Sequence, residues 1–121
     1  MKIDRKYKIW EATCGNDPSR PVLQHVLIER VDETHGLAIA ADGFIMAVVP
    51  CELDADDVVG LVPGHVLKDA STKAVRTLGM QLFLREHEFE YLTRDGAIKV
   101  PRLDVGEFPP YEQIIPPRPT Q

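Results

Sequence analysis

Two Asp-Gly dipeptides constrain the fold of this chain more than any other feature. Asp42-Gly43 and Asp95-Gly96 each stand between two short runs that are rich in apolar residues. Because glycine adopts a positive φ without a Cβ clash, Asp-Gly is a strong signal for a tight hairpin turn. A hairpin makes the two strands that it joins antiparallel. The chain is therefore expected to be built mostly from antiparallel strands.

Runs of β-branched, aromatic and other apolar residues predict about five strands, then one helix, then three strands. The predicted strands are Tyr7–Thr13, Val22–Val31, Leu37–Ala41, Phe44–Pro50, Val58–Val62, Met80–Arg85, Phe89–Arg94 and Ala97–Leu103. An extended segment rich in proline, Glu107–Pro116, follows the last strand. This order predicts an α+β fold with a mostly antiparallel sheet. We expect a single domain over residues 1–116 and a frayed tail over 117–121.

The one predicted helix runs from Gly64 to about Thr77. Pro63 stands at its start, where a missing N–H costs nothing, and Gly79 stands just past its end, where a left-handed cap is favoured. At 100° per residue, one face is apolar and the other polar. The apolar face holds Val66, Leu67, Ala70, Ser71, Ala74, Val75 and Leu78, and the polar face holds His65, Lys68, Asp69, Thr72, Lys73 and Arg76.

Composition excludes several classes of protein. Hydrophobic residues make up 44% of the 121 residues, which is enough to bury one core. No apolar run approaches 18 residues and the N-terminus lacks an apolar signal core, so we expect a cytoplasmic protein with no membrane span. The net charge of −5 argues against a generally basic nucleic-acid binder, although a local basic face remains compatible with it. Cys14 and Cys51 lack a Cys-x-x-Cys spacing and are expected to be structural thiols.

The sequence offers no set of residues with the spacing of a catalytic or metal site. It contains no glycine-rich phosphate loop, no Gly-x-Ser-x-Gly and no His-Glu-x-x-His. His87 lies between two glutamates, but neighbours on a strand point to opposite faces, so a hairpin turn is the expected setting. Asp54, Asp56 and Asp57 are expected to form a solvated acidic loop, because their spacing does not fit a calcium loop. We therefore expect no enzymatic activity, no cofactor and no metal.

Three segments, in order, resemble a domain of the DNA sliding clamps, the polymerase III beta subunit family. The first is Ala40–Pro50, in which Ala41-Asp42-Gly43 stands where clamps have Thr-Asp-Gly or Ser-Asp-Gly. The second is Gly60–Ala70, an apolar-Pro phrase of the kind that opens the second clamp helix. The third is Gly106–Pro116, in which Phe108-Pro109-Pro110-Tyr111 resembles the Phe-Pro-Asp-Tyr ending. The similarity covers most of the chain, from Tyr7 to Pro116.

The resemblance implies a non-enzymatic protein that associates with double-stranded DNA or recruits replication and repair proteins. In clamps the helices line the hole of a ring made of six domains, and sheet edges of neighbouring subunits pair. This chain departs from that pattern, because a loop rich in Pro and Gly replaces the first helix and only one domain is present. A ring would then require six copies of the chain. The alternative is a clamp-fold protein-interaction module that neither binds DNA nor forms a ring.

The polar face of the predicted helix is the candidate DNA contact. His65, Lys68, Lys73 and Arg76 could follow a phosphate backbone without reading bases, although a solvated helix face explains the same residues and Asp69 dilutes their charge. The segment from Phe108 to Tyr111 is expected to pin the chain end against the sheet. Lining an apolar groove for a partner peptide is its alternative role.

Overall fold

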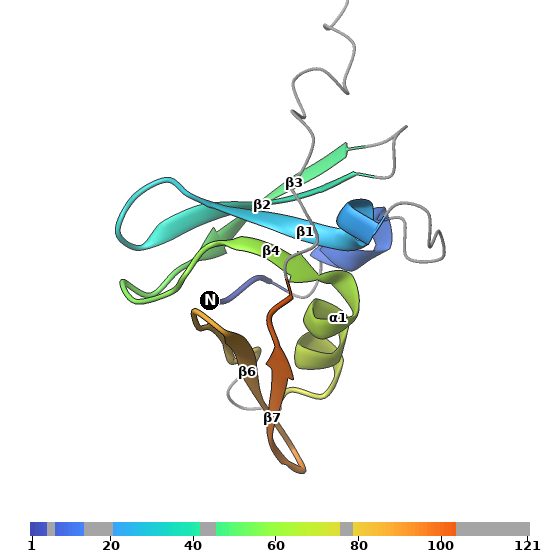
Figure 1. Cartoon of the computed structure of the whole chain (residues 1–121), viewed down its shortest axis with the longest axis vertical. Helices are drawn as coiled ribbons and strands as arrows, with labels where there is room; N and C mark the ends of the chain where they lie inside the picture. The colour runs from blue at the N-terminus through green and yellow to red at the C-terminus, as the bar shows by residue number, and fades with distance from the viewer. Residues whose placement is uncertain (5–6, 14–20, 42–45, 76–78, 104–121) are drawn as a thin grey trace, which may run out of the picture.

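Over the residues that the structure describes, the fold consists of two antiparallel sheets, with one α-helix along their side (Figure 1). The computed structural model describes residues 1–4, 7–13, 21–41, 46–75 and 79–103. One sheet has the order β3-β2-β1-β4 and the other the order β5-β6-β7. The strands are β1 His25–Arg30, β2 His35–Ala41, β3 Met46–Glu52, β4 Gly60–Pro63, β5 Leu82–Leu84, β6 Glu88–Thr93 and β7 Gly96–Pro101. The predicted α+β class, the antiparallel sheets and the single main helix are confirmed.

The second predicted hairpin is present, with its turn one residue earlier than the dipeptide. Thr93 pairs with Gly96, so Arg94 and Asp95 form the loop between β6 and β7. Gly96 has φ of +123°, a conformation that side chains rarely adopt, which explains the glycine at this position. The Thr93 hydroxyl donates a hydrogen bond of 2.8 Å to the Gly96 carbonyl. Asp42-Gly43 lies outside the described residues, and the strands on either side of it pair from Ala41 and Met46 onward.

The predicted strand Tyr7–Thr13 is wrong, because this segment contains the 3-10 helix η2, Ile9–Ala12. Lys8 enters it with φ of +45°, and this bend turns Ile9 into the core, where it is 2% exposed. The Thr13 hydroxyl donates to the Trp10 carbonyl over 2.7 Å and closes the turn. A second 3-10 helix, η3 Pro21–Gln24, occupies the beginning of the strand predicted from Val22, so β1 starts only at His25.

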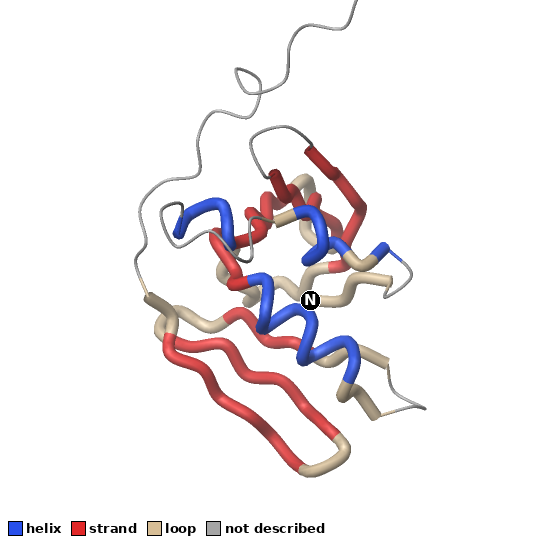
Figure 2. Tube along the Cα trace, turned by 90° about the vertical axis from the view of Figure 1, so that its right-hand side faces the viewer, coloured by secondary structure: helices blue, strands red, loops and turns tan. Residues whose placement is uncertain are grey.

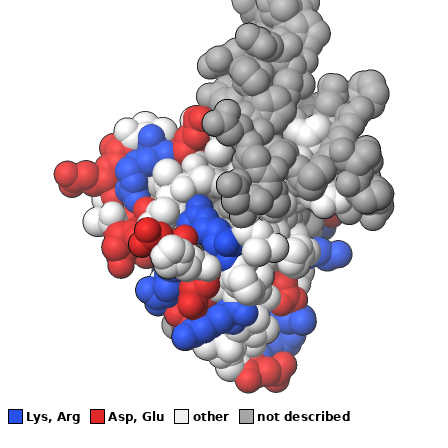
Figure 3. Space-filling view, viewed as in Figure 1, with Lys and Arg blue, Asp and Glu red and all other residues white. Residues whose placement is uncertain are grey.

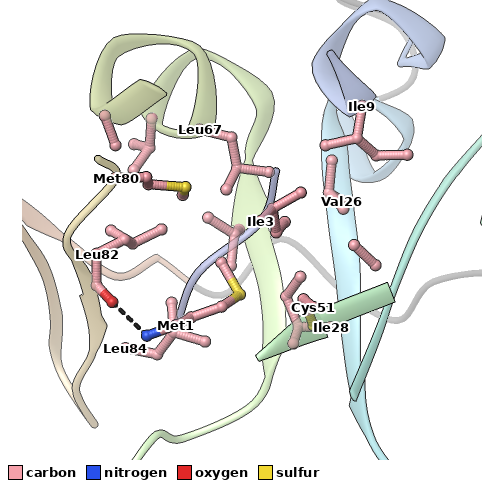
Figure 4. Close-up of a cluster of buried hydrophobic side chains, with 14 of the residues drawn as sticks. Met1, Ile3, Ile9, Val26, Ile28, Cys51, Leu67, Met80, Leu82 and Leu84 are labelled. Atoms are coloured by element: carbon pink, nitrogen blue, oxygen red, sulfur yellow. Dashed lines mark hydrogen bonds between the residues drawn. The ribbon is translucent and has the colours of Figure 1, made fainter. Parts of the chain in front are cut away.

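The N-terminal segment lies between the two sheets (Figure 1). Lys2 and Glu52 exchange two backbone hydrogen bonds of 2.8 Å, which attaches the segment to β3. The Met1 amino group donates to the Leu82 carbonyl of β5 over 2.6 Å. Side chains from the N-terminal segment, η2, both sheets and the helix meet in one core, as Figure 4 shows. Burying each large side chain there contributes about 1.5–3 kcal/mol.

Helix α1 spans Gly64–Thr72 and is shorter than predicted. It starts directly after Pro63, as expected, and buries Gly64, Val66, Leu67, Ala70 and Ser71. The predicted end near Thr77 is wrong, since Lys73 is already the cap residue. The β-branched Thr72 bonds back to the Lys68 carbonyl through its hydroxyl, over 2.8 Å, a competing bond that weakens the end of a helix. Gly79 has φ of +69°, as a cap would, and its N–H donates to the Val75 carbonyl over 2.9 Å.

Within the described part of the chain, no helix is long and apolar enough to cross a membrane. The segment Gly106–Pro116 and the tail 117–121 lie outside the described residues.

Candidate nucleic-acid interface on helix α1

The polar face of α1 is open to solvent. Its exposed residues are His65, Lys68, Thr72 and Lys73, whereas the residues of the opposite face are buried against the sheets. In Figure 2 the helix crosses the side of the molecule that faces the viewer. The structure thus brings three of the four predicted contact residues onto one exposed face: His65, Lys68 and Lys73. The fourth, Arg76, lies outside the described residues.

Asp69 reduces the positive charge of this face. The Lys73 ammonium lies 2.9 Å from Asp69 Oδ1, one helical turn away. The other carboxylate oxygen, Oδ2, accepts a hydrogen bond from the hydroxyl of Tyr91 on β6. These two bonds, that from Tyr91 first, lower the pKa of Asp69 and keep it charged. Burial, assisted by this carboxylate, raises the pKa of Tyr91 to about 12.

Arg94 adds a cation that the sequence did not assign to the face. It lies in the β6–β7 turn and its backbone N–H donates to the Lys73 carbonyl over 3.2 Å. The turn therefore lies beside the end of α1, below the helix in Figure 2. Arg94 is exposed, as is its neighbour Asp95. Nothing in the spacing of Arg94 from the helix signals this contact, because it depends on how the second sheet packs against α1.

Lys, Arg, Asp and Glu are interspersed over the described surface drawn in Figure 3. On the α1 face itself, Asp69 and the exposed Asp95 lie beside Lys73 and Arg94, so this face can make only local contacts with an anion. Lysine ammonium groups bind phosphate as point charges, without geometric selection of a base. The α1 face can thus make weak contacts with the phosphate backbone of DNA, and their strength depends on salt concentration.

The outer edge of β3 is a second surface that presents backbone hydrogen-bonding groups outward. Glu52 bonds outward to Lys2, and backbone groups on an antiparallel strand alternate in direction. The N–H and C=O groups of Met46 and Val48 therefore also point outward, together with the carbonyl of Pro50. In the described part of the chain, only Lys2 pairs with this edge. Val48 is 44% exposed.

A cavity of about 550 Å³ lies between the N-terminal segment, the end of β3 and the segment after α1. Its lining includes Ile3, Tyr7, Cys51, Val75 and Met80. Burial raises the pKa of Cys51 to about 11, so the thiol stays neutral, in agreement with a structural role. Cys14 lies outside the described residues.

Among the described residues, no group of three or more His, Cys, Asp or Glu side chains is placed to hold a metal ion. His87 is exposed in the turn between β5 and β6, the setting expected from the sequence. Asp54 and Asp56 are exposed in the turn after β3, but Asp57 is buried and bonded, so that loop is only partly solvated.

Comparison with known proteins identifies the fold. No protein-family model and no curated protein matches the chain by sequence. Solved structures do match. DNA polymerase III subunit beta from Borrelia burgdorferi has 19% identity and a TM-score of 0.68, over 94% of this chain and 30% of that one. The beta chain from Streptococcus pneumoniae has 19% identity and a TM-score of 0.69, over 96% and 33%.

The sliding clamp from Bacillus subtilis gives similar values: 18% identity and a TM-score of 0.68, over 94% and 30% of the two chains. The chain thus spans about a third of the length of each clamp subunit. The structural similarity at 18–19% identity shows the fold alone. The chain has the fold of one domain of a DNA polymerase III beta sliding clamp.

Proposed function

We propose that this protein is a non-enzymatic, clamp-like module of DNA replication or repair. In this proposal it associates with copies of itself through the edge of β3 and contacts double-stranded DNA through α1. The observation that carries the proposal is the exposed polar face of α1, with Lys68 and Lys73, on a clamp-domain fold. Such a module would act in the cytoplasm by holding or recruiting replication and repair proteins, without chemistry of its own.

Contact with DNA would be weak for a single copy. Lys68 is exposed on the face and Lys73 is held by Asp69, so one copy offers few cations to phosphate. Several copies around one duplex would add their fields. Six copies would supply the number of domains that a clamp ring contains.

Fluorescence anisotropy with a labelled DNA duplex, repeated over a range of salt concentrations, tests the DNA contact. Each phosphate contact contributes about one unit to the slope of log affinity against log salt. Lys68→Gln is expected to weaken binding to all sequences alike and to reduce the slope by about one. Lys99→Gln, an equal loss of charge on β7, serves as control. The absence of salt-dependent binding by the wild type at any protein concentration would refute DNA contact.

Self-association is proposed at β3 because, in the part of the chain that the structure describes, nothing beyond Lys2 pairs with its outer edge. An added strand would satisfy the N–H and C=O groups of Met46 and Val48. A lysine on such an edge opposes strand pairing. Light scattering is expected to show an oligomer for the wild type and a smaller mass for Val48→Lys. Val58→Lys is the matched control, because Val58 is 42% exposed compared with 44% for Val48. A wild-type monomer at high concentration would refute the edge as an interface.

A second candidate function is a clamp-fold interaction module without DNA binding or ring formation. The ion pair between Lys73 and Asp69 favours it, as does the sequence rich in Pro and Gly that stands where the resemblance would place a first helix. This candidate predicts a monomer or dimer, no salt-dependent DNA binding, and a protein partner recovered by pull-down. The anisotropy and light-scattering measurements above separate the two candidates.

A further inference from the structure

We infer that Asp69 sets the DNA affinity of the α1 face by holding Lys73 in an ion pair, and that Tyr91 fixes Asp69 in that position. The inference rests on the proposed contact between α1 and DNA. Asp69 acts in place of a phosphate, because it occupies the cation that a phosphate would otherwise bind.

The two oxygens of Asp69 have separate partners. Oδ1 lies 2.9 Å from the Lys73 ammonium, and Oδ2 accepts the Tyr91 hydroxyl. Tyr91 is 3% exposed and belongs to β6, so the sheet holds the carboxylate in place from the interior. The Lys73 side chain, by contrast, is 54% exposed. Lys73 can therefore swing toward an approaching phosphate, whereas the carboxylate stays on the face.

This anchoring makes the pair more than an ordinary pair on a helix surface. An Asp–Lys pair one turn apart in water is weak, because both side chains are mobile and solvated. Here only Lys73 is mobile. The bond from Tyr91 holds Asp69, and hydrogen bonds to a charged carboxylate are stronger than those between neutral groups. Asp69 also interacts electrostatically with His65, on the same face. A DNA phosphate near α1 thus meets a fixed negative charge beside two of the predicted contact residues.

Asp69→Asn removes the negative charge of this side chain and leaves its shape nearly unchanged. The amide oxygen of asparagine can still accept the Tyr91 hydroxyl, but the residue no longer pairs with Lys73. We expect this variant to bind duplex DNA about three- to tenfold more tightly, with a salt slope larger by about one, because one further cation becomes available. Asp56→Asn makes the same change in net charge in the exposed turn after β3. Because that charge is remote and screened, its effect is expected to stay below about twofold.

Two more variants test whether Asp69 changes the DNA affinity through Lys73 and whether Tyr91 contributes. In Asp69→Asn/Lys73→Gln the gain should disappear and the slope should match that of Lys73→Gln alone. Tyr91→Phe leaves the carboxylate charged but unanchored, so we expect a smaller gain than for Asp69→Asn. Circular dichroism and thermal melting confirm that each variant is folded. If Asp69→Asn is not folded, Tyr91→Phe alone must show the gain.

The outcomes separate this inference from the proposed function. Wild-type binding that Lys68→Gln weakens, with no gain in Asp69→Asn, overturns the role of Asp69 and leaves the DNA contact in place. Weak but salt-dependent binding by the wild type that becomes tighter in Asp69→Asn, and not in Asp56→Asn, supports both. No binding by any variant, Asp69→Asn included, overturns both. An equal gain of DNA affinity in Asp56→Asn would show that the effect comes from the net charge alone, and would also overturn the role of Asp69.

Discussion

The guanidinium carbon of Arg102 lies 5.0 Å from the centre of the Phe89 ring, where the two sheets meet. The same guanidinium donates hydrogen bonds to three backbone carbonyls, those of Val58, Val59 and Arg85, over 2.8 to 3.1 Å. Burial lowers the pKa of Arg102, which still remains charged. One side chain from the end of the second sheet thus satisfies backbone acceptors beside both β4 and β5.

Arg102→Lys is expected to destabilise the fold by about 1.5–3 kcal/mol, because a lysine cannot reach these acceptors in the same fork geometry. Urea denaturation measures the change. Arg85→Lys is the matched control, since Arg85 also lies over a phenylalanine ring, that of Phe83 at 5.4 Å, but bonds a partly exposed glutamate. That change should stay below about 1 kcal/mol. Equal effects of the two substitutions would contradict the role given to Arg102.

Burial of the Tyr91 hydroxyl, together with its bond to Asp69, predicts a loss of stability at alkaline pH. The pKa of Tyr91 is raised from 10.0 to about 12, so folding favours the neutral phenol. The contribution is complete below pH 10 and disappears as the pH rises toward 12. The difference in unfolding free energy between wild type and Tyr91→Phe should therefore shrink by about 2 kcal/mol over this range. A difference independent of pH would show that the hydroxyl titrates normally in the folded state.

Asp57 is expected to be essential for the turn after β3. Its side chain, 3% exposed, lies 2.9 Å from the Met1 ammonium. It also accepts the N–H groups of Leu84, over 3.2 Å, and Asp54, over 2.9 Å. Asp57→Ala leaves these donors without their acceptor and should cost about 2–4 kcal/mol by urea denaturation. Asp56→Ala is the control, because Asp56 is an exposed neighbour. It should change the free energy of unfolding by less than about 0.5 kcal/mol.

Cys51 should react only when the protein unfolds. Its pKa of about 11 leaves about a thousandth of the thiol ionised at pH 8, and the thiolate is the reactive form. In a Cys14→Ser variant, where Cys51 is the only cysteine, we expect negligible labelling by an aromatic disulfide reagent at pH 8 and rapid labelling in urea. The unfolded sample is its own control. Rapid labelling of the native variant would show that the cavity beside Cys51 admits the reagent.

Local signals in the sequence predicted most of the sheets and the start of the helix. The Asp95-Gly96 dipeptide located a hairpin, and Pro63 located the beginning of α1, because both residue types act on their own backbone. The prediction of a strand over Tyr7–Thr13 is wrong because tertiary packing determines the conformation of that segment. Lys8 takes a left-handed conformation that lets Ile9 enter the core. No periodic pattern signals such a bend.

The candidate site was predictable only in part. Helical periodicity placed His65, Lys68 and Lys73 on one exposed face, because exposure follows from the buried stripe opposite. The partners of that face come from another element: Tyr91 lies 22 positions from Asp69 in the sequence. Such contacts follow from the packing of the second sheet against α1, which single-residue propensities do not describe.

Pro50 gives the edge of β3 a further property. Proline has no N–H, so an added strand finds outward donors at Met46 and Val48 and none at Pro50. A partner strand that slid along the edge by two residues would lose a bond there, so the proline penalises the wrong alignment. The same gap hinders uncontrolled stacking of strands into fibrils. An edge that presents outward donors at Met46 and Val48 is thereby protected from aggregation.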